Sequence, residues 1–304
     1  MRVVGEAQIR SAIGAAEAVD AMREAVIAYS RGELETPMPM HVDLSAGGGG
    51  EVHIKSSYRR GASRWALKVA GTYATRPYGS IVLVSAEDGA TLAYFDDGGY
   101  LTDLRTAAVA AMTARELGRA DEALAILGTG VQARLQATLH AGVLPLREVR
   151  IWGRDRAKAE RCARDVAASL PGVAASAVHS PAEAAAAARL IVTATASRAP
   201  LLAAADLRPG THVSAVGSDT PGKQELDPEI LRRAALLLVD SKAQCERLGE
   251  LQHARSEAGR AIELGAFCER PTPYDRAGIT VADFTGLGAE DLYIAEACLA
   301  RISA

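Results

Sequence analysis

The sequence of 304 residues lacks the features that mark several classes of protein. Its formal net charge is −3, so it has no basic excess of the kind that binds nucleic acid. No window reaches about 18 uninterrupted apolar residues, so we expect no membrane span. The alanine-rich run at 180–192 is too short and contains Glu183 and Arg189. The first 22 residues show no apolar segment followed by a cleavage site, so we expect a cytoplasmic protein.

The spacings of the cysteines and histidines match no disulfide or metal-binding motif. The cysteines have no C-x-x-C spacing and are expected to be reduced thiols: Cys162, Cys245, Cys268 and Cys298. The histidines show neither H-x-x-x-H nor H-x-x-E-H spacing: His41, His53, His140, His179, His212 and His253. Because zinc sites on helices use these spacings, we expect no metal site.

The first 117 residues combine helices with short strands. Apolar residues recur at steps of three and four over 7–31, which predicts one amphipathic helix. Between residues 41 and 96, short alternating runs separated by glycine clusters predict an antiparallel meander of strands. A further helix is expected over 102–117, with Thr102 or Asp103 as its N-cap.

From about residue 120 the pattern changes to alternating strands and helices. The strands are nearly continuous runs of isoleucine, valine and leucine, which is typical of a parallel sheet covered on both faces. We therefore expect an α/β protein whose second domain is a Rossmann doubly wound parallel sheet. The last helix, 288–302, follows that domain, and we expect it to return to the first one.

A glycine turn separates the first strand of this region from the helix after it. Gly128 allows a tight turn, Gly130 leaves room for a phosphate beside the backbone, and Ala133 allows helix and strand to pack closely. The start of the helix offers N–H groups and a positive dipole end to the phosphates. The alternative is a strand-to-helix connection that binds no ligand, but the context favours a dinucleotide site.

The end of the next strand bears on the choice of nucleotide. In NAD-binding folds an acidic residue about 20 positions after the glycine turn binds the ribose hydroxyls. Here Gly153 stands at that place and Arg154 follows it. A guanidinium suits a 2′-phosphate, so the sequence favours NADP, with NAD possible. Asp155 is expected to cap the following helix, although its carboxylate could instead reach the ribose.

Five segments together resemble the ornithine cyclodeaminase/mu-crystallin family: LTDLRTAAVAA at 101–111, AILGTGVQARLQ at 125–136, VSAVGSDTPGKQELDPEIL at 213–231, RLGELQHA at 247–254 and FTGLGAEDL at 284–292. Their order and spacing match over nearly the whole chain. Within the family, the chain looks nearest to ectoine-utilisation cyclodeaminase-like proteins, iminosuccinate reductases and alanine dehydrogenases.

The resemblance implies a domain organisation and a chemistry. Residues 1–117 with 289–304 are expected to form an α+β substrate-binding and dimerisation domain from both chain ends. Residues 118–288 are expected to form the Rossmann NAD(P)-binding domain, and the protein is expected to be a homodimer. Members act at the α-carbon of an amino acid or its imine.

Three residues match the family's catalytic positions. Lys68 would bind the substrate carboxylate, although alternation with Leu67 and Val69 could instead point it at solvent. Arg105 would hold the carboxylate close to the nicotinamide, or be an exposed helix arginine. Asp219 follows a buried strand and would exchange a proton with the substrate amine, or cap a turn, or both.

Further residues match positions that surround substrate and cofactor. Lys55 would bind a distal carboxylate or be a solvated strand lysine, and Leu287 would wall the substrate pocket. His41 stands where many members carry an arginine for the carboxylate, which it replaces poorly. Glu250 either orients a neighbour or caps a turn. The positions that match the cofactor site are Gly128, Thr129, Gly130, Val131, Gln132, Arg154, Thr195, Val216 and Lys223.

These features favour an NAD(P)-dependent oxidoreductase that interconverts a small amino acid and its imine or ketimine. The first alternative is an ornithine cyclodeaminase-type lyase, which converts a diamino acid into a cyclic imino acid such as proline, releases ammonia and recycles NAD. The second is an NADPH-binding protein without turnover. Retention of Lys68, Arg105 and Asp219 argues against the second.

Overall fold

The computed structural model describes residues 1–303, with side chains for residues 1–302. The chain forms two compact units, one of Met1–Arg105 with the chain from Leu287 onward, the other of Thr106–Gly286. No helix in the described residues is long and apolar enough to cross a membrane. The four cysteines are all buried and are free thiols. The boundaries expected at residues 117 and 289 stay a prediction.

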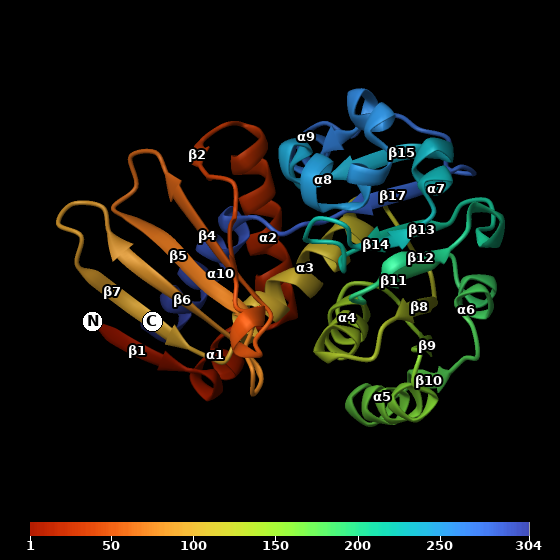
Figure 1. Cartoon of the computed structure of the whole chain (residues 1–304), viewed down its shortest axis with the longest axis horizontal. Coiled ribbons are helices and arrows are strands. Elements are labelled where there is room, and N and C mark those ends of the chain that lie inside the picture. The colour runs from red at the N-terminus through yellow and green to blue at the C-terminus, as the bar shows by residue number, and fades with distance from the viewer. Residues whose placement is uncertain (304) are drawn as a thin grey trace. The chain divides into compact units, whose positions relative to one another are not determined.

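The first unit contains a mixed sheet with helices at both ends of the chain (Figure 1). Within the described residues seven strands join, in the order β1-β7-β6-β5-β4-β2 with β3 also paired to β4. The strands are β1 (Arg2–Gly5), β2 (Leu34–Glu35), β3 (Met40–Asp43), β4 (Glu51–Arg59), β5 (Arg64–Thr72), β6 (Pro77–Ser85) and β7 (Thr91–Asp96). Its helices are α1 (Glu6–Ala12), α2 (Ala15–Ser30), a short 3-10 helix η1 (Ser45–Gly47) and α10 (Gly288–Ser303), while α3 (Tyr100–Glu116) contains the boundary between the units.

The antiparallel meander predicted for this region is confirmed. Strands β4, β5, β6 and β7 pair antiparallel in sequence order, and only β1 joins β7 in parallel among the described strands. Helix α10, blue in Figure 1, packs on β4, β5 and β6 and also contacts α2. At its start Gly288 lies so close to β4 that a Cβ there would be 2.4 Å from the carbonyl oxygen of Ser56. The covered face of the sheet is therefore buried by a helix from the opposite end of the chain.

Two expectations about helices in the first 117 residues are wrong in detail. The helix expected over 7–31 is two helices, because Ile13 adopts an extended conformation and Gly14 caps the start of α2. The helix expected over 102–117 begins at Tyr100, so neither Thr102 nor Asp103 is its N-cap. Asp97 instead accepts the amides of Gly99 and Leu101 at 2.9 and 2.7 Å.

The second unit is a parallel α/β sheet, which confirms the predicted Rossmann fold (Figure 1). Within the described residues eight strands join in the order β10-β9-β8-β11-β13-β17-β15-β16, and every pairing is parallel. These strands are β8 (Ala123–Leu127), β9 (Glu148–Trp152), β10 (Ala174–Ala177), β11 (Leu190–Thr193), β13 (His212–Ala215), β15 (Ala234–Val239), β16 (Ile262–Glu263) and β17 (Ile279–Asp283). A separate parallel pair consists of β12 (Arg198–Leu202) and β14 (Gln224–Leu226).

Helices connect these strands and cover the sheet. They are α4 (Val131–Ala141), α5 (Arg156–Ser169), α6 (Pro181–Ala187), α7 (Pro228–Arg233), α8 (Lys242–Leu248) and α9 (Leu264–Glu269), with 3-10 helices η2 (Ala204–Asp206), η3 (Glu250–His253) and η4 (Arg255–Arg260). Apolar clusters pack on both faces, one around Ile126 and Val149, the other around Leu127 and Val213. Burial on both faces explains why these strands are continuous apolar runs. The sequence patterns did not predict β17, although all its residues are buried.

Candidate functional site

The glycine turn lies at the carboxyl end of β8 and leads into α4. Gly128 has a φ of 142°, and a Cβ there would be 2.5 Å from the carbonyl oxygen of Ala194, so this position requires glycine. A Cβ at Gly130 would meet no atom within 4 Å. Gly130 is also the N-cap of α4 and has no side chain to accept the first amides of the helix. The start of α4 therefore has no side-chain cap, and a helix start of this kind favours an anion.

A pocket of about 270 Å³ lies at this turn. Its walls come from the segments after β8, β9 and β11: Gly128, Thr129, Gly130, Trp152, Gly153, Arg154, Asp155, Lys158, Ala194, Thr195, Ala196, Ser197 and Leu201. Strands β8 and β11 are neighbours although two strands separate them in sequence, so the strand order reverses between them. Open α/β sheets bind ligands at the carboxyl ends of strands at such a reversal.

The end of β9 bears directly on the choice of nucleotide. A Cβ at Gly153 would lie 2.4 Å from Cγ2 of Thr129, so no acidic side chain fits there while Thr129 keeps its place. Asp155 caps α5 by accepting the amide of Lys158 at 3.1 Å, as expected. Arg154 and Lys158 are exposed and line the pocket. Lys158 was not among the predicted residues, although it lies in the first turn of α5, shortly after Arg154.

A buried glutamate fixes one wall of the pocket. Glu225 accepts the amide and hydroxyl of Thr195 at 2.6 and 2.7 Å and the amide of Gly217 at 3.0 Å. Burial raises the pKa of Glu225, and these hydrogen bonds oppose the rise. Glu250 in turn accepts the amides of Glu225 and Leu226 at 2.8 and 3.1 Å. The structure therefore supports the interpretation that Glu250 orients a neighbour, and it adds Glu225, which the sequence did not single out.

Asp219 lies in the loop after β13. The ammonium of Lys223 donates to its carboxylate at 2.6 Å, and the Asp219 side chain is 36% exposed. Gln252 holds this loop, because its side-chain amide accepts the N–H of Gly222 and donates to the carbonyl of Lys223 at 2.8 and 3.3 Å. The RLGELQHA segment thus braces the loop that carries Asp219, a role that sequence reasoning missed.

Some predicted cofactor residues lie outside the walls of this pocket. Val131 and Gln132 form the first turn of α4, and Val216 packs against the core after β13. Lys223 pairs with Asp219. Of the predicted cofactor residues, the pocket brings together Gly128, Thr129, Gly130, Arg154 and Thr195.

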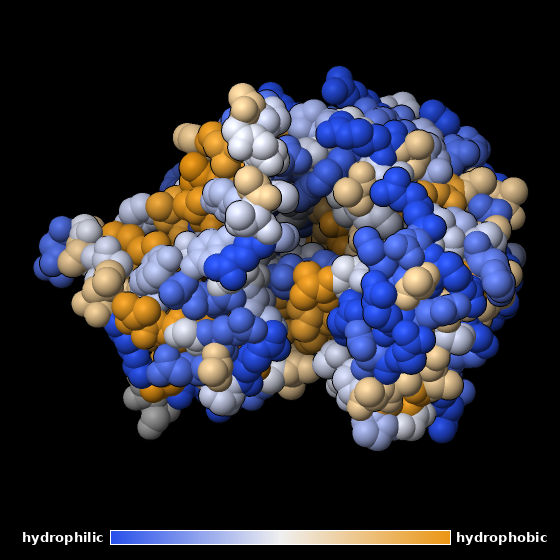
Figure 2. Space-filling view, turned by 60° about the horizontal axis from the view of Figure 1, so that its bottom comes forward, coloured by the Kyte–Doolittle hydropathy of each residue, from blue (hydrophilic) through white to orange (hydrophobic). Residues whose placement is uncertain are grey.

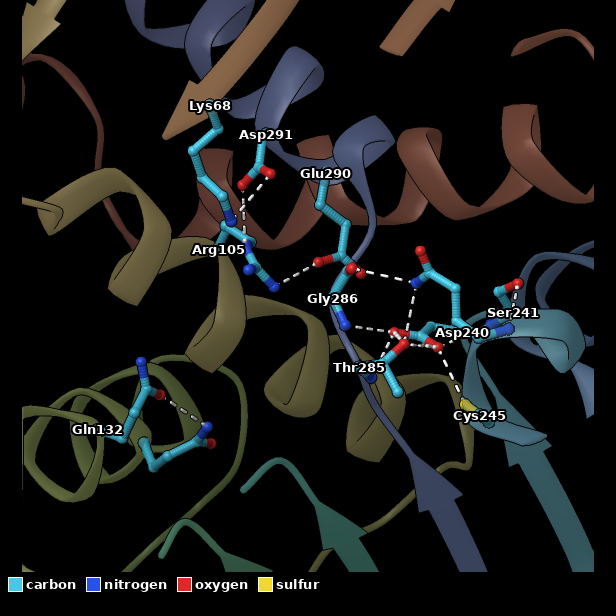
Figure 3. A network of polar contacts seen from close by, with 12 residues as sticks. Lys68, Arg105, Gln132, Asp240, Ser241, Cys245, Thr285, Gly286, Glu290 and Asp291 are labelled. Atoms are coloured by element: carbon cyan, nitrogen blue, oxygen red, sulfur yellow. Dashed lines mark hydrogen bonds and ion pairs between the residues drawn. The ribbon is translucent and has the colours of Figure 1, made fainter. Parts of the chain in front are cut away.

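The first unit holds a buried group of charged side chains (Figure 3). The Lys68 ammonium lies 3.0 Å from Oδ2 of Asp291, and Nε of Arg105 lies 3.1 Å from Oδ1. Arg105 also pairs with Glu290 at 2.8 Å. Lys55 is 5% exposed and stands directly opposite Lys68 across β4 and β5. Three cationic and two anionic side chains are therefore concentrated in a buried region, which is rare outside functional sites.

Burial and the neighbouring charges shift the pKa values of Lys68 and Asp291. Lys68 is 2% exposed, and burial lowers its pKa to about 7 although Asp291 opposes the change. Burial also disfavours ionised Asp291, but Lys68 and Arg105 outweigh it, so the pKa of Asp291 is lowered. The alternatives of a solvated strand lysine, left open for Lys68 and Lys55, and of an exposed Arg105, are wrong. Helix α10 covers this face of the sheet and supplies Asp291.

The remaining substrate candidates differ in exposure. Leu287 is fully buried immediately before α10. His41 is exposed on β3 and stands opposite His53 on β4, with ring centroids 4.4 Å apart. Glu51 lies close to both histidines, so these side chains form a group that could hold a metal ion. The absence of helical histidine spacings did not exclude this arrangement, because strand pairing creates it.

Comparison with known proteins matches residues 2–304 to the ornithine cyclodeaminase/mu-crystallin family. A protein of Rhizobium meliloti (strain 1021), provisionally named a dehydrogenase, is 38% identical over 320 residues, covering 100% of this chain and 96% of that protein. The iminosuccinate reductase of Paracoccus denitrificans in complex with NAD+ superposes with a TM-score of 0.89 at 29% identity, covering 100% of this chain and 96% of that one. An archaeal alanine dehydrogenase dimer with bound NAD gives a TM-score of 0.88 at 26% identity, covering 99% and 95%.

Proposed function

The chain belongs to the ornithine cyclodeaminase/mu-crystallin family, and from this premise we propose that it is an NAD(P)-dependent oxidoreductase that interconverts a small amino acid and its imine or ketimine. The observation that carries the proposal is the buried group around Lys68, Arg105 and Asp291. Burying several cations costs free energy, and packing alone gives no reason for it. A substrate carboxylate gives these cations a function.

The second unit supplies the nucleotide site in this proposal. The glycine turn and the uncapped start of α4 bind the pyrophosphate through Gly128, Thr129, Gly130, Val131 and Gln132. Thr195, Val216 and Lys223 contact the rest of the cofactor. When bound, the nicotinamide supplies or accepts the hydride. We propose 118–288 as the nucleotide-binding domain and 1–117 with 289–304 as the substrate-binding and dimerisation domain.

The chain's own residues bind the substrate and handle its proton. Lys68 and Arg105 hold the α-carboxylate, and Asp219 takes a proton from the amine or stabilises the iminium in the reverse direction. Lys55 and His41 bind the distal part of the substrate, and Leu287 forms an apolar wall. Lys223 keeps the Asp219 carboxylate oriented through their 2.6 Å contact.

We propose NADP rather than NAD as the preferred nucleotide. The contact between Gly153 and Thr129 leaves no room for the acidic residue that binds a ribose 2′-hydroxyl. Arg154 and Lys158 provide two cations at the pocket wall, where a 2′-phosphate would bind. The solved relatives with bound NAD show that the fold also accepts NAD, so the preference depends on these side chains.

We also propose that the protein is a homodimer formed through the uncovered face of the mixed sheet. Hydrophobic side chains gather on the surface of the first unit in Figure 2. Among the described residues of the first unit, Val3, Met40, Val42 and Leu92 are large hydrophobic side chains that are 54%, 61%, 39% and 39% exposed. A strand face of this composition is typical of an interface between subunits. The alanine dehydrogenase relative is itself a dimer.

A panel of substrates with both cofactors tests the reaction. We expect NADPH to be oxidised when one of three substrates is added: the cyclic imine pyrroline-2-carboxylate, the open-chain imine iminosuccinate, or pyruvate together with ammonia. Ammonia release from ornithine without net NADH formation would instead identify a cyclodeaminase. Tight NADPH binding without turnover of any compound would identify a binding protein.

A further inference from the structure

The hairpin formed by β3 and β4 brings three potential metal ligands together. His41 and His53 are directly opposite in the antiparallel register, and Asp43 is opposite Glu51. Residues that face each other across a strand pair share a face of the sheet, and so do residues two apart on one strand. His41, His53 and Glu51 therefore project from one face, whereas Val42 and Val52 project from the other.

Their separations suit a single ion. One ligand atom from each of the three residues lies within 4.8 Å of the others, and the imidazole rings are tilted by 59° with centroids 4.4 Å apart. Zinc binds imidazole nitrogen and carboxylate oxygen at ~2.0–2.2 Å, so small rotamer changes bring all three into range. His41 is exposed and the other two are partly exposed, so an ion can reach them. Asp43 is held elsewhere, because its carboxylate accepts the amide of Ser45 at 2.8 Å.

Small residues adjoin this group on the neighbouring strands. His53 stands opposite Ala70 on β5, and Ala70 stands opposite Gly79 on β6. Neither Ala70 nor Gly79 has a charged side chain that would compete with the ion. Along β4, Lys55 follows His53 by two residues, on the same face and ~7 Å away. The ligand group thus continues the sheet face that carries Lys55 and, opposite it, Lys68.

We propose that His41, Glu51 and His53 bind one divalent transition-metal ion of the zinc class. Two imidazoles favour such ions over Mg²⁺ and Ca²⁺, which prefer oxygen ligands. Three protein ligands leave a coordination position for water or for a ligand carboxylate or amine. This site stands on the three ligands alone. Its further role, in which His41 acts on the distal group of a substrate bound at Lys55 and Lys68 through the ion, rests on the proposed function.

Metal titration of the whole chain, purified without a polyhistidine tag and stripped with chelator, tests the proposal. Zn²⁺ is titrated in competition with a chromophoric chelator, and bound metal is counted after gel filtration. We expect one Zn²⁺ per chain, and a loss of affinity of at least about tenfold in both His53→Ala and Glu51→Gln. His179→Ala, which removes an exposed histidine of the second unit, is the matched control and is expected to bind Zn²⁺ as the unaltered chain does.

Thermal unfolding provides a second readout. Zn²⁺ is expected to raise the unfolding temperature of the unaltered chain and of His179→Ala, but not that of His53→Ala, because the ion binds the folded hairpin. Equal Zn²⁺ affinity in His53→Ala, Glu51→Gln and His179→Ala would overturn the proposal, as would the absence of stoichiometric binding. A cooperative unfolding transition of the metal-free form of each variant verifies that it is folded. Zinc binding without any turnover would leave the metal site standing and refute the proposed reaction, whereas turnover without zinc binding would do the reverse.

Discussion

The ionisation of Lys68 makes the stability of the protein depend on pH in a direction that can be calculated. Burial lowers the pKa of Lys68 from 10.5 to about 7 in the folded chain. Below pH 7 both folded and unfolded states carry the proton, and the cost of burying the cation is fully present. Between pH 7 and 10.5 the unfolded state binds more protons, so stability rises with pH. One pH unit is worth ~1.4 kcal/mol, so the gain by pH 9 is on the order of 3 kcal/mol.

Substitution by an unbranched apolar residue isolates this contribution. Lys68→Met removes the titrating ammonium group and leaves all other ionisable groups in the chain. Urea unfolding of both proteins, at one protein concentration and at pH 6.5, 7.5, 8.5 and 9.5 (about one unit apart), gives the difference in their free energies of unfolding. We expect the unaltered chain to gain stability relative to Lys68→Met as the pH rises.

One control separates this effect from general loss of charge. Lys158→Met removes an exposed lysine and is expected to show no such trend relative to the unaltered chain. A constant difference between the unaltered chain and Lys68→Met at all four pH values would refute the reasoning. That result would mean that Asp291 keeps Lys68 protonated in spite of burial.

Three further substitutions test the proposed site. Arg154→Ala is expected to weaken NADPH binding by about tenfold to a hundredfold, with little change for NADH, because one charge-assisted contact to the 2′-phosphate is lost. Asp219→Ala is expected to lower kcat by about a hundredfold or more because the group that exchanges the proton is removed, and to change the cofactor Kd far less, through the loss of its contact with Lys223 alone. Glu225→Gln is expected to lower the free energy of unfolding by about 1–3 kcal/mol and to weaken nucleotide binding, because the amide nitrogen cannot accept the hydrogen bonds of Thr195 or Gly217.

Each of these predictions has a result that would contradict it. If Arg154→Ala weakens the binding of NADPH and NADH equally, as measured by fluorescence titration, Arg154 does not bind the 2′-phosphate. If Asp219→Ala keeps its steady-state turnover, Asp219 does not transfer the proton. Urea midpoints unchanged in Glu225→Gln would show that these donors find other partners.

The parts of the fold that local patterns determine were predictable. The glycine turn, the strand before it and the helix after it depend on neighbouring residues, and the structure has β8 and α4 at those places. The meander of β4 to β7 follows from alternation and glycine-rich turns. The interruption of the first helix at Gly14 was missed, because the apolar periodicity continues across it.

The environment of Lys68 could not be predicted from its neighbours. Alternation shows only which residues share a face of a strand, not which face is covered. The covering helix begins at Gly288, and its Asp291 is 186 positions from the Arg105 that it contacts. The grouping of His41, Glu51 and His53 was not predicted for a related reason, since His41 and His53 become neighbours only through strand pairing. Contacts that depend on such long separations are set by tertiary packing.

The close approach of Thr129 to Gly153 couples these two positions. A side chain introduced at Gly153 would place its Cβ 2.4 Å from the methyl group of Thr129, so the threonine would have to turn away or be replaced. A carboxylate at position 153 is therefore expected to be tolerated better in a Thr129→Ala background than in the unaltered chain.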